Sequence, residues 1–205
     1  SYLKDGHIHI VAAPGSGKTT LGIELLGRIN KPVLILAPSI TIREQWKERI
    51  ISAFLDPNEN PDEWISQSLR NPAPITIATY QALHSAMTRF KGTLDDMKSG
   101  EDDDSDNSDD LMVHEEQVDF SSFNLTDAMI SSGTQVLLLD ECHHLRSEWW
   151  KALEEYKSTM VKATGNQTVI ALTATPPYDS NLTSWNRYIS MCGEIDEEIT
   201  VPELV

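Results

Sequence analysis

A glycine-rich stretch that follows a short apolar run has the clearest chemistry in this chain of 205 residues. Residues 12–20 read Ala-Ala-Pro-Gly-Ser-Gly-Lys-Thr-Thr. Two glycines let successive backbone N–H groups turn toward one anion, and a helix that begins at the lysine adds its positive end. The lysine would reach the β- and γ-phosphates of ATP, and the next hydroxyl would bind Mg²⁺. The predicted phosphate-binding residues are Pro14, Gly15, Ser16, Gly17, Lys18, Thr19 and Thr20.

Two adjacent carboxylates extend the predicted chemistry. Asp140 and Glu141 follow the apolar residues 136–139. Asp140 would hold Mg²⁺ together with Thr19, while Glu141 would orient and deprotonate the attacking water, so these two and Lys18 are the predicted catalytic residues. The alternatives are a solvated charge pair at a strand end and a glycine-rich turn with a surface lysine. The presence of both patterns in one chain favours the nucleotide site.

Five short apolar runs are the elements that must position these groups: residues 7–13, 32–38, 75–80, 135–140 and 168–173. Each run is continuous rather than alternating, which is typical of strands buried on both faces. Helical segments separate the runs. The sequence therefore predicts an α/β domain with a mostly parallel central sheet that helices cover on both sides. Ligands of such sheets bind beyond the carboxyl ends of the strands, where the two carboxylates lie.

Helical periodicity is visible between the runs. Residues 18–29 carry one apolar face, and a second apolar stripe recurs every four positions at Ile42, Trp46, Ile50 and Phe54. Thr41 and Glu44 have the spacing of a capping box at the start of that helix. A third stripe over residues 149–160 predicts another helix, with Ser147 as its cap.

The order of short motifs resembles that of superfamily 2 helicases and translocases of the DExH type. Asp140-Glu141-Cys142-His143 looks like motif II, and Ala12 fits the family's phosphate loop, which often begins with alanine. The other matches are Ala37-Pro38-Ser39 with Gln45-Trp46 for motif Ia, Thr79-Tyr80-Gln81-Ala82-Leu83 for motif Ib, and Leu172-Thr173-Ala174-Thr175-Pro176-Pro177 for motif III. The likeness is greatest to the branch that holds excision-repair helicases and restriction-enzyme motor subunits.

This resemblance implies a three-layer, RecA-like P-loop NTPase domain over residues 1–178. It implies an extension or connector toward a second RecA-like lobe over residues 179–205, and ATP hydrolysis that drives movement on nucleic acid, with DNA favoured over RNA. The residues expected to couple hydrolysis to nucleic-acid grip are His143, Thr173 and Thr175. The candidates for contacting the nucleic-acid backbone are Ser39, Gln45, Thr79 and Tyr80, for which helix capping and packing are equally good explanations.

The charge of the chain is unevenly distributed. Sixteen basic and 32 acidic residues give a formal net charge of −16, and residues 95–119 hold twelve of the acidic residues and one lysine. We interpret residues from about 91 to 119 as an acidic insert and expect the like charges of residues 101–110 to keep it mobile. Because the remainder is nearly balanced, the net charge does not argue against a nucleic-acid partner.

Other features narrow the functional class. No apolar run is long enough to span a membrane, no secretory leader is visible, and Cys142 and Cys192 alone suit a reducing compartment, so we expect a cytoplasmic protein. Cys142, His143 and His144 are too closely spaced to bind one zinc ion. Two other functions stay open from the sequence: a P-loop ATPase that remodels proteins, and a nucleotide-gated binding module that does not hydrolyse ATP.

Overall fold

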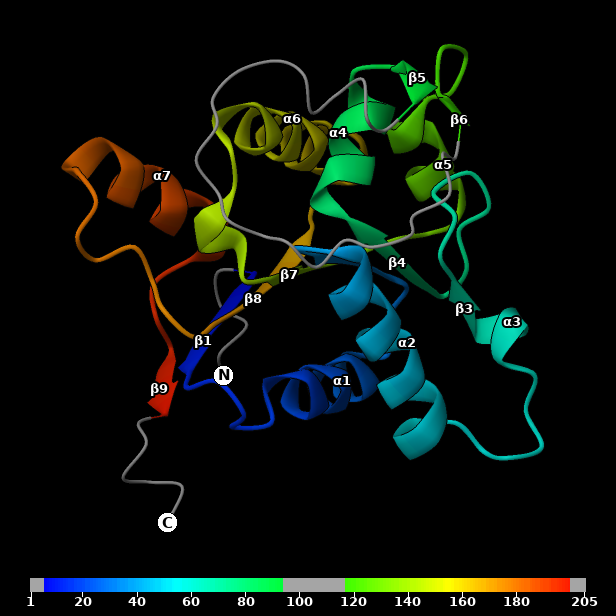
Figure 1. Ribbon diagram of the computed structural model, residues 1–205, viewed down its shortest axis with the longest axis horizontal. Helices are drawn as coiled ribbons and strands as arrows, with labels where there is room; N and C mark the ends of the chain where they lie inside the picture. The colour runs from blue at the N-terminus through cyan, green and yellow to red at the C-terminus, as the bar shows by residue number, and fades with distance from the viewer. Residues whose placement is uncertain (1–5, 94–116, 200–205) are drawn as a thin grey trace.

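A parallel sheet runs through the centre of the protein (Figure 1). The computed structural model describes residues 6–93 and 117–199, and within them the sheet comprises β1 (His7–Ala12), β2 (Val33–Ala37), β3 (Ile65–Ser66), β4 (Ile75–Thr79), β7 (Val136–Asp140), β8 (Thr168–Thr173) and β9 (Glu197–Ile199). Their spatial order is β3-β4-β2-β7-β8-β1-β9, and all neighbours pair in parallel. The five strands expected from the apolar runs are confirmed. The sequence prediction lacks the edge strands β3 and β9, since both are too short to form an apolar run.

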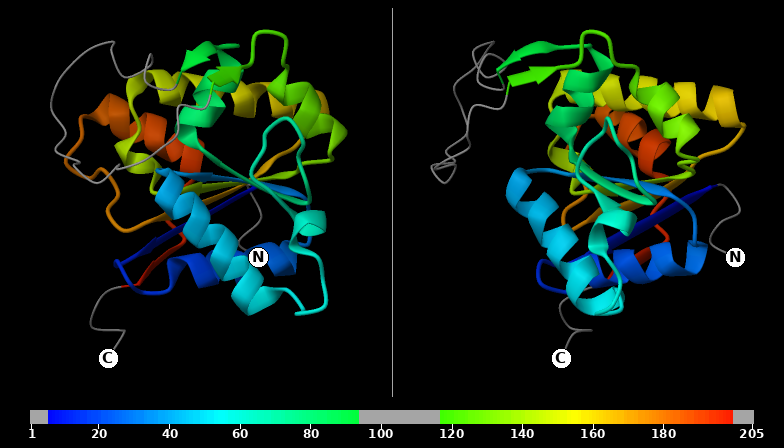
Figure 2. Two further views of the ribbon diagram at one scale, coloured as in Figure 1. Left: turned by 45° about the vertical axis from the view of Figure 1, so that its right-hand side comes forward. Right: turned by 90° about the vertical axis from the view of Figure 1, so that its right-hand side faces the viewer.

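Helices cover both faces of this sheet, which confirms the three-layer α/β prediction (Figure 2). One face carries α1 (Lys18–Ile29) and α2 (Ile40–Phe54). The opposite face carries α4 (Tyr80–Met87), α5 (Leu125–Ser131), α6 (Ser147–Thr164) and α7 (Leu182–Cys192). The short helix α3 (Pro61–Trp64) adjoins β3 at the sheet edge.

Successive strand residues supply the two hydrophobic cores. In β2, Leu34 and Leu36 pack with α4 to α7, whereas Ile35 packs with α1 and α2, and all three are fully buried. The central strands β7 and β8 alternate in the same way. Burial on both faces explains why the central strands read as unbroken apolar runs.

The structure corrects the predicted helix caps. Helix α2 begins at Ile40, and its cap is Ser39, whose Oγ accepts a hydrogen bond from the Ile42 N–H at 3.2 Å. The predicted capping box of Thr41 and Glu44 is wrong because both residues lie inside the helix. Ser147 is the first residue of α6 rather than its cap, so that prediction is wrong as well.

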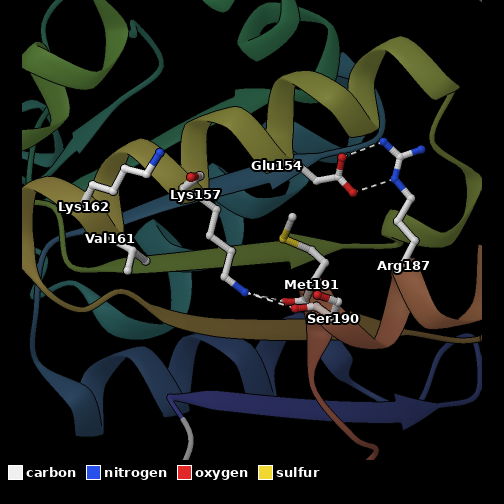
Figure 3. A pocket seen from close by; sticks show the side chains of 8 residues that line it. Glu154, Lys157, Val161, Lys162, Arg187, Ser190 and Met191 are labelled. Atoms are coloured by element: carbon white, nitrogen blue, oxygen red, sulfur yellow. Dashed lines mark hydrogen bonds and ion pairs between the residues drawn. The ribbon is translucent and has the colours of Figure 1, made fainter.

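Helix α7 and strand β9, within residues 182–199, pack against the rest of the domain. Helix α7 buries Tyr188, Met191 and Cys192 in the core, and β9 pairs with β1. Figure 3 shows the polar contacts that join α7 to α6: Arg187 donates to both carboxylate oxygens of Glu154 at 2.6 and 2.7 Å, and Lys157 Nζ donates to the carbonyls of Ser190 and Met191. Residues 182–199 therefore pack as part of this domain, and the boundary at residue 178 stays a prediction.

The acidic insert starts and ends in an antiparallel pair, β5 (Lys91–Thr93) and β6 (Gln117–Asp119). The expected mobility of residues 101–110 concerns a segment that lies outside the described residues. Among the residues that the structure describes, no helix has the length and apolar character needed to cross a membrane.

Candidate nucleotide site

The phosphate loop connects the end of β1 to the start of α1. Gly15 and Gly17 have φ angles of 77° and 87°, in the left-handed region that glycine adopts without strain. Within the loop, the Ser16 N–H donates to the Ala13 carbonyl at 3.1 Å. The Ser16 Oγ is buried and has no hydrogen-bond partner in the described part of the chain, so it is available to a phosphate oxygen.

Lys18 points from the first residue of α1 into the site. Its Nζ forms an ion pair with Glu141 Oε1 at 3.1 Å and donates to the Ala12 carbonyl at 3.1 Å. Thr19 and Thr20 follow in the first turn of α1. The fold therefore brings the loop and the second predicted carboxylate together, although about 120 residues separate them in the sequence.

Asp140 lies at the end of β7 and is 6% exposed. Its Oδ2 accepts a hydrogen bond from Trp46 Nε1 at 2.8 Å, and its main-chain carbonyl accepts one from the Tyr80 hydroxyl at 3.0 Å. Burial raises the pKa of Asp140 to about 6; the Trp46 hydrogen bond opposes this rise, and the neighbouring Glu141 charge adds to it. A cation beside this buried carboxylate would stabilise its charged form, as expected for a Mg²⁺ ligand.

Glu141 is held by contacts at its backbone and at both carboxylate oxygens. Its φ angle of 49° is unusual for a residue other than glycine, and its N–H donates to the Leu172 carbonyl at 2.9 Å. Oε2 accepts from the Thr173 hydroxyl at 3.0 Å and from the Ala174 N–H at 2.9 Å. Burial alone would raise the pKa of Glu141, but the Ala174 and Lys18 hydrogen bonds outweigh it and lower the pKa. Glu141 is therefore ionised at neutral pH.

The three predicted coupling residues lie in one hydrogen-bonded group. The ring of His143, in the short 3-10 helix after β7, is 2.7 Å from the Thr173 hydroxyl through Nδ1 and 2.9 Å from the Thr175 hydroxyl through Nε2. Because Thr173 gives its proton to Glu141, it must accept one from His143 Nδ1. A neutral ring then accepts from Thr175 at Nε2. Glu141 is thus connected to β8 and the loop after it.

The four candidate nucleic-acid contacts have different surroundings. Ser39 caps α2, and Thr79 caps α4 by accepting from the Ala82 N–H at 3.1 Å. Gln45 is exposed on α2. Tyr80 is 0% exposed, and its hydroxyl donates to the Asp140 main-chain carbonyl, which favours the packing explanation for this residue. Its aromatic ring fills the core between α4 and the sheet.

Trp46 belongs to an apolar helical stripe in the sequence, and its contact with Asp140 could not be predicted from that stripe. The indole N–H indicates that an acceptor must lie near this ring, because a buried tryptophan usually hydrogen-bonds through it. The residues present fit Mg·ATP: they supply a lysine, a hydroxyl at Thr19, a carboxylate at Asp140 and a buried Ser16 hydroxyl that has no partner among the described residues.

Residues 3–178 match the ResIII family, described as "Type III restriction enzyme, res subunit". The chain belongs to this family. The match confirms the resemblance to superfamily 2 helicases and translocases, and it covers every residue of the site around Lys18, Asp140 and Glu141. The DExH-like tetrad of this ResIII domain lies at the carboxyl end of β7, beside the phosphate loop.

Individual proteins are similar to this chain in sequence or in fold. The ResIII domain is 32% identical over 91 residues to the "Putative DNA 3'-5' helicase Rad25" of Halobacterium salinarum, which is 44% of this chain and 15% of that protein. The fold of this chain is similar to that of the Hef helicase domain of Pyrococcus furiosus, with a TM-score of 0.56 and 19% identity. The similarity covers 97% of this chain and 36% of the other. A hypothetical ATP-dependent RNA helicase from Sulfolobus tokodaii has a similar fold as well, with a TM-score of 0.50 and 15% identity. The similarity covers 95% of this chain and 48% of that one. The chain thus spans less than half the length of each of these proteins.

Proposed function

We propose that this ResIII chain is the ATP-binding lobe of a nucleic-acid-dependent ATPase, a helicase or translocase. The convergence of Lys18, Asp140 and Glu141 at one edge of the sheet supports this proposal most directly. A solvated charge pair, the alternative considered for the carboxylates, would not be buried beside a phosphate loop.

Each residue has a distinct task in this proposal. Lys18 and the loop N–H groups bind the β- and γ-phosphates, and the Ser16 hydroxyl donates to a phosphate oxygen. Thr19 and Asp140 hold Mg²⁺, which withdraws charge from the phosphates when bound. Glu141 orients a water molecule and accepts its proton, because its lowered pKa keeps the carboxylate ionised.

The ion pair between Lys18 and Glu141 implies an exchange of partners during ATP binding. Lys18 Nζ contacts Glu141 Oε1 at 3.1 Å and would turn to the phosphates. Glu141 then loses one partner but keeps Thr173 and Ala174 at Oε2, so it stays in place with Oε1 directed to water. A shift of Glu141 would also displace His143 and Thr175 through their hydrogen bonds, and so the loop after β8.

DNA is the proposed nucleic acid, because the Halobacterium relative is described as a putative DNA helicase. The Sulfolobus protein of similar fold is described as an RNA helicase, so RNA belongs in the same experiment. The remaining parts of the ATPase, among them a second RecA-like lobe, are proposed to lie in a longer protein of which this domain forms part.

Calorimetry with Mg·ATP tests the nucleotide site. Lys18→Ala should remove nucleotide binding, since the substitution removes the ion that faces the phosphates. Lys31→Ala, which makes the same charge change on an exposed residue after α1, should leave it intact. Equal binding by the Lys18→Ala variant would show that the loop has been misinterpreted.

The partner is tested by ATP hydrolysis in the longer protein, with single-stranded DNA, with RNA and without either. Stimulation by nucleic acid supports the proposal. Hydrolysis that nucleic acid leaves unchanged would favour an ATPase that remodels proteins, and binding without hydrolysis would favour a nucleotide-gated module.

A further inference from the structure

Two buried aromatic side chains hold Asp140 by hydrogen bonds. Trp46 Nε1 donates to the carboxylate oxygen Oδ2 at 2.8 Å, and the Tyr80 hydroxyl donates to the main-chain carbonyl at 3.0 Å. Trp46 is 1% exposed, and it comes from α2, whereas Tyr80 comes from α4. The two donors therefore reach Asp140 from opposite faces of the sheet.

The indole of Trp46 is also in contact with the helix that follows the phosphate loop. A Cβ atom at Gly22 of α1 would lie 2.8 Å from Trp46 Cη2 and 2.8 Å from Leu172 Cδ1. Such a distance is too short for any side chain, so the glycine makes room for the ring. The ring of Trp46 is therefore packed between α1 and the sheet, and its N–H donates to Asp140.

We propose that Trp46 is a positioning residue that orients the Asp140 carboxylate for the metal of a metal–nucleotide complex. This inference rests on the proposed function, in which Asp140 is a Mg²⁺ ligand. One N–H donor on Oδ2 restricts rotation of the carboxylate and leaves Oδ1 as the oxygen that meets the ion. Packing of the ring against Gly22 fixes the donor relative to the helix that begins at Lys18 and Thr19.

Trp46 lies on the helix that carries two of the candidate nucleic-acid contacts, Ser39 at its cap and Gln45. Ser39 caps the same helix, and Gln45 is exposed one residue before Trp46. A movement of α2 caused by a ligand at these residues would move the donor of the Asp140 carboxylate. The hydrogen bond is a direct physical link from that helix to the metal ligand.

The test replaces Trp46 by benzothienylalanine, in which sulfur takes the place of the indole N–H and the ring keeps its shape. Binding of Mn²⁺ in the presence of ADP is measured by electron paramagnetic resonance, and binding of ADP alone by calorimetry. We expect Mn²⁺ affinity to fall about 10- to 100-fold, as is typical when a metal ligand loses its supporting hydrogen bond, with metal-free ADP binding unchanged. The same replacement at Trp150, a buried tryptophan that packs against Tyr188, should change neither affinity.

A second measurement needs neither metal nor nucleotide. In a spectrum of the chain with ¹⁵N-labelled tryptophan, the indole signal that disappears in Trp46→Phe belongs to Trp46. Asp140→Ala should shift this signal because it removes the acceptor, and it should leave the Trp150 signal in place. If the Trp46 indole signal does not shift in Asp140→Ala, the proposal is overturned.

The outcomes separate this inference from the proposed function. If the parent chain binds Mn·ADP and the benzothienylalanine variant binds Mn²⁺ equally well, the positioning role is wrong and the proposed function stands. A variant that loses metal-free ADP binding as well would show a structural role of the ring instead. Failure of the parent chain to bind Mn·ADP would overturn both.

Discussion

Adjacent carboxylates in this site have different environments and opposite pKa shifts. Burial raises the pKa of Asp140, whereas hydrogen bonds from Ala174 and Lys18 outweigh burial at Glu141 and lower its pKa. Two titratable groups whose pKa values are driven apart usually divide the chemistry between them. Asp140 is suited to receive a cation, and Glu141 to accept a proton from water.

Glu141→Gln separates nucleotide binding from hydrolysis. The substitution keeps the size of the side chain and an oxygen that can accept from Thr173 and Ala174, but it removes the base. We expect nucleic-acid-stimulated hydrolysis in the longer protein to fall about 10²- to 10⁴-fold while ATP binding persists. Glu155→Gln, on an exposed position of α6, is the matched control and should retain full activity. Full activity of Glu141→Gln would assign the base elsewhere.

Residues whose predicted function depends on a short stretch of sequence can be recognised from the sequence alone. The loop from Pro14 to Thr20 carries its own turn chemistry, so its residues could be predicted directly. The partners of Asp140 could not, because Trp46 is 94 residues away in sequence. A helical stripe indicates that such a ring is buried, but it gives no information on which acceptor the N–H meets.

Helix α1 shows how packing sets the role of a residue within an element. Gly22 and Gly27 both lower the intrinsic helix propensity of α1. Only the environment distinguishes them: a Cβ at Gly22 meets Trp46 and Leu172 at 2.8 Å, while a Cβ at Gly27 has nothing within 4 Å.

Alanine substitution of these two glycines should therefore have opposite effects. Gly27→Ala removes backbone freedom from the unfolded chain and should raise the free energy of unfolding by about 0.5–1 kcal/mol. Gly22→Ala forces the indole or Leu172 to move and should lower it by about 1–3 kcal/mol. Urea denaturation of both variants measures the difference. A Gly22→Ala variant as stable as the parent would mean that the indole can shift freely.

His9 links β1 to α7 and to the segment between α7 and β9. Its Nδ1 must donate to the Gly193 carbonyl at 2.9 Å, so the neutral ring accepts from the Tyr188 hydroxyl at Nε2, 2.8 Å away. Burial lowers the pKa of His9 below its ordinary value of 6.5, although the Gly193 hydrogen bond and Asp196 oppose the shift. The unfolded chain therefore binds a proton more readily than the folded one.

The free energy of unfolding should accordingly fall as the pH drops through 6.5 toward the lower pKa of the folded state. His9→Gln cannot titrate in this range and should lose less stability between about pH 7 and pH 5 than the parent. His84, whose pKa burial also lowers, leaves a residual slope in both proteins. Chemical denaturation at the two pH values provides the comparison, and identical losses would exclude a contribution from His9.

Elements with strong apolar content were predictable, and those defined by distant contacts were not. The central strands carry unbroken apolar runs, so the layers of the fold follow from the sequence. Strand β9 reads Glu-Glu-Ile and exists because β1 pairs with it, while α7 is fixed by Arg187 and by its buried face. Such contacts place residues 182–199 in the domain without leaving a local signature.

Across the described residues of the molecule, one lysine or arginine forms an ion pair with Glu141, the proposed catalytic base: Lys18. Five arginines of the described residues have partners away from this site: Arg28 with Glu24, Arg43 with Glu44, Arg187 with Glu154, Arg146 with the ring of Trp149, and Arg70 with the rings of Phe120 and Phe123. Charge that develops on the transferred phosphoryl group therefore needs a further cation, which the proposed second lobe would supply.

This need predicts that the 205-residue chain alone hydrolyses ATP slowly. A cation contributed by a second body accelerates phosphoryl transfer by about 10³- to 10⁵-fold in other systems, so the longer protein with DNA or RNA should turn over at least about a hundredfold faster than this chain. Both are assayed at saturating Mg·ATP, with Lys18→Ala preparations to subtract contaminating ATPase. If this chain alone reached within about tenfold of the longer protein, its own residues would suffice to stabilise the transition state. The two-lobe proposal would then give way to a self-contained ATPase, because no cation from outside the domain would be required.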